Sequence, residues 1–266
     1  MSLRRKLRPL TAAVIAALAL SCSRRPEETV TPPPAAPGAP ELVRRADELY
    51  ALREDTGRAR EAVALLRRAR TLDEGDYGAH WKLARSLHYL GEALEEAVER
   101  DASYSEGIAA GQTAVRVNAG GVEGHYWLGA NLAGRTELQG VIGDLAAVGE
   151  VRREMEAVVA ADEGYERGGA YLHLARVEME LPRVLGGDRR RAVELLEKGL
   201  KFGADNAALR LQLARAFLAA RRREDARREL QMILAMEPHP DYVPEHRRAA
   251  AEAGRLLKER FEKQGR

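Results

Sequence analysis

The sequence predicts an all-α fold in which helical hairpins stack in chain order, and three observations support this. First, Ala192–Ala204 and Ala226–Pro238 match each other at a spacing of 34 residues. Second, apolar residues recur at helical spacing in other segments, such as 79–91 and 122–132. Third, no segment shows a convincing strand pattern. Because 34 residues is the period of the tetratricopeptide repeat, a helix–turn–helix unit, the chain is expected to be a tetratricopeptide-like α-solenoid.

About five helical hairpins are expected between residues 41 and 266. The first hairpin is expected within 41–73, the second at 79–91 and 104–117, and the third at 122–132 and 151–160. The helix that ends the fourth hairpin is expected to begin at 189, and the last hairpin is expected at 211–217 and 226–238. An ordinary helical bundle whose apolar positions coincide with this template is the alternative. Since about three repeats suffice for a continuous core, five predict a stable array, and such arrays usually present a binding surface. The side chains predicted to pack between neighbouring helices include Trp81, Trp127, Leu128 and Leu213.

Some hairpins are longer than the standard repeat, and one of the insertions has its own apolar pattern. Glu137–Glu150 is predicted to be an amphipathic helix, because apolar residues recur along it with helical spacing. One interpretation is that these side chains pack on neighbouring helices. The other is that they line an apolar groove, a channel or an oligomer contact. On the second interpretation the candidates for binding a partner or an apolar ligand are Leu138, Val141, Ile142 and Leu145.

The first 21 residues are expected to be a lipoprotein signal peptide. A basic start precedes the apolar run Leu10–Leu20, which is too short to span a bilayer. The run ends in Ala19-Leu-Ser-Cys22, which resembles the lipobox of bacterial lipoproteins, so we expect Cys22 to carry the lipid, palmitate among its acyl chains. The alternative is a plain cleaved leader. Cys22 is the only cysteine in the chain, so no internal disulfide is expected.

Residues 22–40 are predicted to be a lipidated, proline-rich tether, and residues 41–266 the repeat domain. The tether is rich in proline, alanine and threonine, a composition that favours an extended, semi-rigid segment. The net charge of +2 includes four basic residues of the leader, and without them 39 basic residues face 41 acidic ones. Because the mature chain is nearly neutral, with both signs interspersed, nucleic acid is not an expected partner.

No catalytic, metal or cofactor site is predicted. The six histidines do not occur in zinc-ligand spacing, and no phosphate loop or nucleophile motif follows a strand. Gly186-Gly187-Asp188 is predicted to be a glycine turn, with Asp188 capping a helix that begins at Arg189. The chain is therefore not expected to be an enzyme.

Roughly residues 75 to 238 resemble the T-component proteins of TRAP transporters. The resemblance is carried by Gly124-His-Tyr-Trp-Leu-Gly129, by 155–169, and by Leu181-Pro182 leading into Gly186-Gly187-Asp188 and 192–198. It implies a tetratricopeptide-repeat periplasmic lipoprotein that associates with the solute-binding P-subunit of the transporter. It also implies self-assembly, as a homo-oligomer, around an apolar passage.

Two functions are therefore predicted as alternatives. In the first, the chain is a lipid-anchored accessory component of TRAP-type solute uptake in the periplasm, which docks a P-subunit and shelters an apolar ligand. In the second, it is a general repeat scaffold for envelope assembly, attached to a bacterial membrane in the same way. Fold alone does not decide between them.

Overall fold

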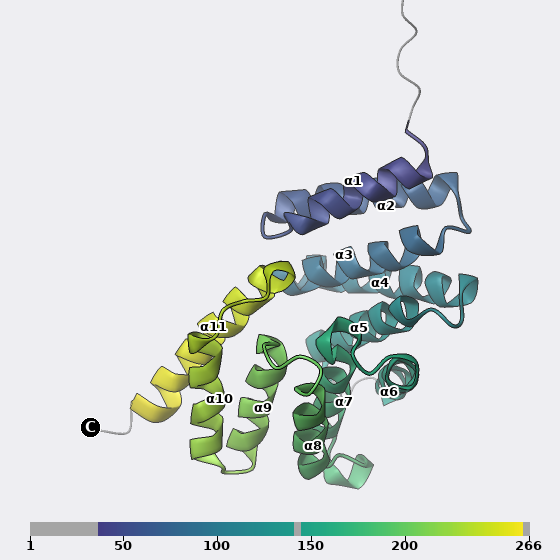
Figure 1. The fold of residues 1–266 in the computed structure, drawn as a ribbon. Helices are drawn as coiled ribbons and strands as arrows, with labels where there is room; N and C mark the ends of the chain where they lie inside the picture. The colour runs from purple at the N-terminus through teal and green to yellow at the C-terminus, as the bar shows by residue number, and fades with distance from the viewer. Residues whose placement is uncertain (1–36, 141–144, 263–266) are drawn as a thin grey trace, which may run out of the picture. The chain divides into compact units, whose positions relative to one another are not determined.

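The computed structural model describes residues 37–140 and 145–262, and the regular structure within these ranges is entirely helical. The expected leader, Cys22 and most of the tether lie outside the described residues. Figure 1 shows the helices, whose bounds are α1 Ala39–Ala51, α2 Thr56–Leu72, α3 Tyr77–Ala93, α4 Ala97–Val117, α5 Val122–Gln139, α6 Leu145–Ala161, α7 Gly169–Glu180, α8 Arg189–Gly199, α9 Ala207–Ala219, α10 Arg223–Ala235 and α11 Val243–Leu257. Short one-turn helices, among them η2 (Tyr165–Arg167), η3 (Arg183–Leu185) and η4 (Pro240–Tyr242), occupy three of the connections.

The helices pair into five consecutive hairpins, from α1–α2 to α9–α10, followed by α11 (Figure 1). Each helix packs on the next one in chain order, and the first helix of a hairpin also contacts the first helix of the next hairpin. The second helices α8 and α10 begin at Arg189 and Arg223, which reproduces the 34-residue spacing of the sequence. The predicted tetratricopeptide-like solenoid of about five hairpins is confirmed.

Side-chain caps define where several helices begin. Asp55 accepts a hydrogen bond from Gly57 N–H ahead of α2, and Asp76 accepts one from Ala79 N–H at the start of α3. Such caps satisfy backbone N–H groups that have no partner within the helix, and each contributes about 1 kcal/mol. The two acidic caps therefore define the residues at which α2 and α3 begin.

Glycine allows helices to approach closely around one buried tyrosine. The ring of Tyr104, in α4, is packed between Gly91 of α3 and Gly134 of α5. A Cβ atom added at Gly91 would lie 2.4 Å from the ring, and one added at Gly134 would lie 2.5 Å from it. Because real Cβ atoms do not approach this closely, only glycine fits both positions with the tyrosine in place.

The continuous helix expected over residues 137–150 is not formed. The first three of these residues end α5, and Leu145 begins α6. Between them Gly140 has φ +91, a conformation that ends a helix and that glycine adopts without a Cβ penalty. The described residues of the segment are therefore divided between the end of α5 and the start of α6.

In the part of the chain that the structure describes, every helix is too short or too polar to cross a bilayer.

Candidate functional site

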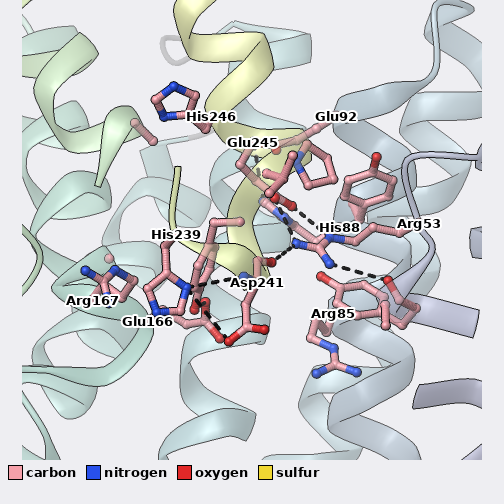
Figure 2. A pocket seen from close by; sticks show the side chains of 18 of the residues that line it. Arg53, Arg85, His88, Glu92, Glu166, Arg167, His239, Asp241, Glu245 and His246 are labelled. Atoms are coloured by element: carbon pink, nitrogen blue, oxygen red, sulfur yellow. Dashed lines mark hydrogen bonds and ion pairs between the residues drawn. The ribbon is translucent and has the colours of Figure 1, made fainter. Parts of the chain in front are cut away.

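A cavity of about 1040 Å³ lies on the inner face of the repeats. The first helices of four hairpins, α1, α3, α5 and α7, contribute to its walls, together with the start of α9. The segment of η4 and the beginning of α11 lies across it, as Figure 2 shows from close by. The cavity is therefore built by residues from both ends of the repeat array.

The α3 helix shows how the sequence positions the lining side chains. Trp81, Arg85, His88 and Glu92 follow one another at intervals of three or four residues, so they share one helical face and line the cavity. The leucines of the same helix, such as Leu83, are buried against neighbouring helices. An aromatic and charged stripe opposite an apolar stripe is thus the local pattern that forms this wall.

One end of the cavity holds a stacked arginine. The guanidinium carbon of Arg85 lies 3.9 Å from the ring centroid of Tyr50 and 5.1 Å from that of Trp81. Arg85 Nη2 donates to Asp47 at 2.9 Å, and Lys82 forms an ion pair with the same carboxylate. Lys82 and Arg85 therefore share one carboxylate, and the faces of Tyr50 and Trp81 also attract the guanidinium of Arg85.

The start of α11 is attached to the first hairpins by buried and exposed ion pairs. Arg53 lies two residues after the end of α1 and is 5% exposed, and it donates to both carboxylate oxygens of Glu245, at 2.9 Å and 2.8 Å. Arg248 Nη2 lies 3.0 Å from a carboxylate oxygen of Glu92. These contacts join helices that are far apart in the sequence, and they keep α11 over the cavity (Figure 2).

The middle of the cavity is lined by aromatic and imidazole rings. Tyr126 makes edge-on contacts with Trp127, at a centroid distance of 4.9 Å, and with His173, at 5.8 Å. Burial lowers the pKa of His88, and it holds the pKa of His173 well below the ordinary value. Both imidazoles are therefore neutral at pH 7 and add no positive charge to the wall.

Glu166, in η2, presents a carboxylate to the cavity. Its Oε2 accepts a hydrogen bond of 2.8 Å from the hydroxyl of Tyr242. Burial raises the pKa of the Glu166 carboxyl, while the Tyr242 hydroxyl acts in the opposite direction. Both Glu166 and Arg167 have positive φ, 46 and 58, which is rare for residues with side chains. Strained backbone of this kind costs of order 1–3 kcal/mol per residue and is concentrated at functional sites.

The residues predicted as an apolar contact surface lie elsewhere. Leu138 is half-buried near the end of α5, and Leu145 is 46% exposed at the start of α6; neither lines the cavity. Val141 and Ile142 lie outside the described residues. Sequence reasoning does not find the lining residues of the cavity, because it assigns Trp81 and Trp127 to packing between helices. The stripe of aromatic and charged residues along α3 is the signal that could have indicated them.

The glycine turn between α7 and α8 has the predicted structure. Gly186 has φ +95, and a Cβ atom at Gly187 would lie 2.0 Å from the carbonyl oxygen of Leu181. The Asp188 side chain accepts hydrogen bonds from the N–H groups of Arg190 and Arg191, at 2.9 Å and 3.3 Å. The turn is therefore a helix cap, as expected from its sequence.

A known family model matches a part of the sequence that includes this turn and most of the repeat array. The model of the TRAP transporter T-component matches residues 79–260, well over half of the chain. This chain belongs to the TRAP transporter T-component family. Membership makes it an accessory component of a TRAP transporter and implies association with the solute-binding protein of that transporter. The match begins in α3 and ends beyond α11, so it includes most of the cavity wall.

Solved structures support the fold of this T-component. A thermophilic tetratricopeptide-repeat protein of Thermus thermophilus, TTC0263, is similar with a TM-score of 0.61 and 20% identity, over 82% of this chain and 100% of that one. The pilF protein of Pseudomonas aeruginosa has a TM-score of 0.53 and 17% identity, over 84% of this chain and 94% of that one. At these identities the likeness concerns the fold. A search of the curated proteins found no match. Among the described residues, no group of histidine, aspartate and glutamate side chains suits a metal ion.

Proposed function

We propose that this T-component is a lipid-anchored periplasmic protein that docks the solute-binding P-subunit of a TRAP transporter and holds a small ligand in its inner cavity. The lipid on Cys22 attaches it to a bacterial membrane, and the proline-rich tether separates the repeats from the lipid surface. The observation that carries the proposal is the family match over residues 79–260. Its role is binding rather than catalysis.

The cavity supports the ligand-holding part of this proposal. Its volume of about 1040 Å³ lies at the upper end of the range of small-molecule sites. Aromatic rings line its walls and polar groups converge on it, which is the usual composition of a ligand pocket. We expect the apolar body of a ligand to contact these rings.

We propose the surface around Leu138 and Leu145 as the contact for the P-subunit or for another copy of the chain. Leu145 is 46% exposed at the start of α6, and Leu138 lies near the end of α5. An exposed leucine and a half-buried one offer apolar area that a protein partner can cover. This surface is separate from the cavity, so docking and ligand binding use different residues.

The docking proposal is tested by capturing partners with the full chain, purified in detergent. The P-subunit encoded with the transporter should co-purify with it, and Leu138→Asp and Leu145→Asp should reduce the captured amount at least about tenfold. Leu72→Asp, at a leucine that is 56% exposed at the end of α2, is the matched control and should have no effect. Capture of an envelope-assembly factor without any P-subunit would overturn the proposal. Size-exclusion chromatography of the same variants reports self-assembly at this surface.

A further inference from the structure

We infer that the inner cavity binds an organic cation, a ligand with a protonated amine on an apolar body, and that the carboxylate of Glu166 pairs with the amine. This inference rests on the ligand-holding part of the proposed function and specifies the chemical class of that ligand. It is independent of the docking of the P-subunit.

The first argument is that the positive groups of the cavity already have partners within the chain. Arg53 is bonded to Glu245, and Arg167 forms an ion pair with Asp205. Lys82 and Arg85 share Asp47, and Arg85 is also stacked on two aromatic rings. The charge of each of these cations is therefore already matched by a carboxylate of the chain, although the Nε–H groups of Arg85 and Arg167 are buried without a hydrogen-bond partner.

The second argument is that Glu166 lacks a cationic partner. Among the described residues its hydrogen-bond partner is the neutral hydroxyl of Tyr242, and no lysine, arginine or histidine nitrogen lies within ion-pair distance. The charged groups that face it are Arg85 of α3 and Arg53 after α1, both engaged elsewhere, and Glu245 of α11, which repels its charge. Removing a carboxylate from water without a counter-charge is unfavourable, and a cationic ligand would supply that counter-charge.

The third argument is the composition of the surrounding wall. Tyr126 and Tyr242 line the cavity together with Glu166, and the Tyr242 hydroxyl is bonded to that carboxylate. The ring centroid of Tyr126 lies 5.2 Å from that of Tyr165, which precedes Glu166 in the chain. Aromatic faces attract ammonium groups through their quadrupole and contact the apolar body of the same ligand. A carboxylate beside several aromatic rings is a combination that selects organic cations over anions of the same size.

Three probes of the same shape and different charge test this inference. Benzylamine, benzoate and benzyl alcohol share one ring and differ in being cationic, anionic and neutral at pH 7. The chain contains two tryptophans, Trp81 and Trp127, and both line the cavity. Tryptophan fluorescence of the full chain in detergent therefore reports on occupancy. We expect saturable binding of benzylamine, with benzoate and benzyl alcohol at least about tenfold weaker.

The variants locate the charge that produces this preference. Glu166→Gln should remove the preference for benzylamine, while circular dichroism shows unchanged helix content. Glu163→Gln is the matched control, because Glu163 is in the same turn but pairs with Lys198 outside the cavity. Loss of the preference in both variants would show that net charge, not Glu166, causes it, and would overturn the assignment.

The remaining outcomes separate the inference from the proposed function. Equal binding of the three probes, or tighter binding of benzoate, would overturn the cationic assignment while leaving the cavity as a ligand site. No saturable signal with any probe would overturn both the cation inference and the ligand-holding part of the proposed function. Because the unmodified chain alone distinguishes these results, they do not depend on how any variant folds.

Discussion

Arg53 and Glu245 are 192 residues apart in the sequence and form a two-pronged ion pair at 2.9 Å and 2.8 Å. The guanidinium of Arg53 also lies 4.7 Å from the ring centroid of Tyr50. The Arg53 side chain is almost completely buried and that of Glu245 is 26% exposed, so the pair is partly shielded from water and salt. The contact fixes the start of α11 against the end of α1.

Removing one member of this pair should destabilise the fold strongly. Glu245→Gln leaves the buried guanidinium of Arg53 without a counter-charge, which costs about 3–5 kcal/mol in comparable pairs. Chemical denaturation monitored by circular dichroism measures the loss. Arg44→Gln is the control, because Arg44 pairs with Glu41 and Glu48 at the surface and should cost less than about 1 kcal/mol. Equal effects of the two variants would contradict a buried role for Arg53.

Acid should destabilise the protein in the range where histidine titrates. Burial depresses the pKa of His173 and of His88 in the folded state, so the unfolded chain binds more protons there. Their stabilising contribution is present above the unfolded pKa of about 6.5 and is lost as the pH falls from that value through the folded pKa. The groups that act on these two imidazoles are Glu92, Arg176, Arg248 and Glu245.

Unfolding free energies measured between pH 7.5 and pH 5 test this prediction. Each histidine should contribute a slope of up to about 1.4 kcal/mol per pH unit below its unfolded pKa. His173→Gln should reduce the slope, since glutamine does not titrate. His239→Gln is the control, because the His239 side chain at the N-cap of η4 is 33% exposed, whereas His173 is buried. An unchanged slope in His173→Gln would show that this imidazole does not cause the pH dependence.

Alanine at Gly134 should disturb the packing around Tyr104. The added Cβ would lie 2.5 Å from the ring, and the helices must separate to accommodate it. Overpacking of this kind costs about 1–3 kcal/mol. Gly149→Ala is the opposite case, because nothing lies within 4 Å of its added Cβ and it is inside α6. That change should stabilise the helix by about 0.5–1 kcal/mol, so the two variants should shift the denaturation midpoint in opposite directions.

Replacement of Cys22 should release the protein from the membrane fraction. Cys22→Ala removes the thiol that would carry the lipid, and residues 37–140 and 145–262 contain no helix that could cross a membrane. Fractionation of cells that express the two forms measures the distribution. Cys22→Ser is the matched control for a small polar side chain and should give the same release. Retention of both variants in the membrane fraction would contradict the lipid anchor.

Much of the fold was predictable because it is encoded locally. The 34-residue spacing identified the hairpins, and Gly187-Asp188 predicted a turn and cap that the structure contains. The predicted helix over residues 137–150 was wrong, because an apolar period does not reveal the positive φ at Gly140. The end of a helix at such a glycine depends on one residue, whereas periodicity averages over many.

The cavity was harder to predict because its wall is assembled from distant segments. Glu166, in η2, faces Tyr242 of η4, and no repeat spacing relates these two residues. The stripe of α3 that includes Trp81 and Arg85 could have been read from helical spacing alone. The sequence did not indicate that the start of α11 packs back over the inner face of the repeats and covers the cavity.

The contact between the first hairpin and α11 also has a consequence for unfolding. Tandem repeats ordinarily interact only with their nearest neighbours, so they fray from their ends and melt in segments. Here the two ends hold each other through Arg53, which makes the loss of either terminal helix costly for the other. We therefore expect the array to melt in a single cooperative transition, and separating its ends should restore stepwise fraying.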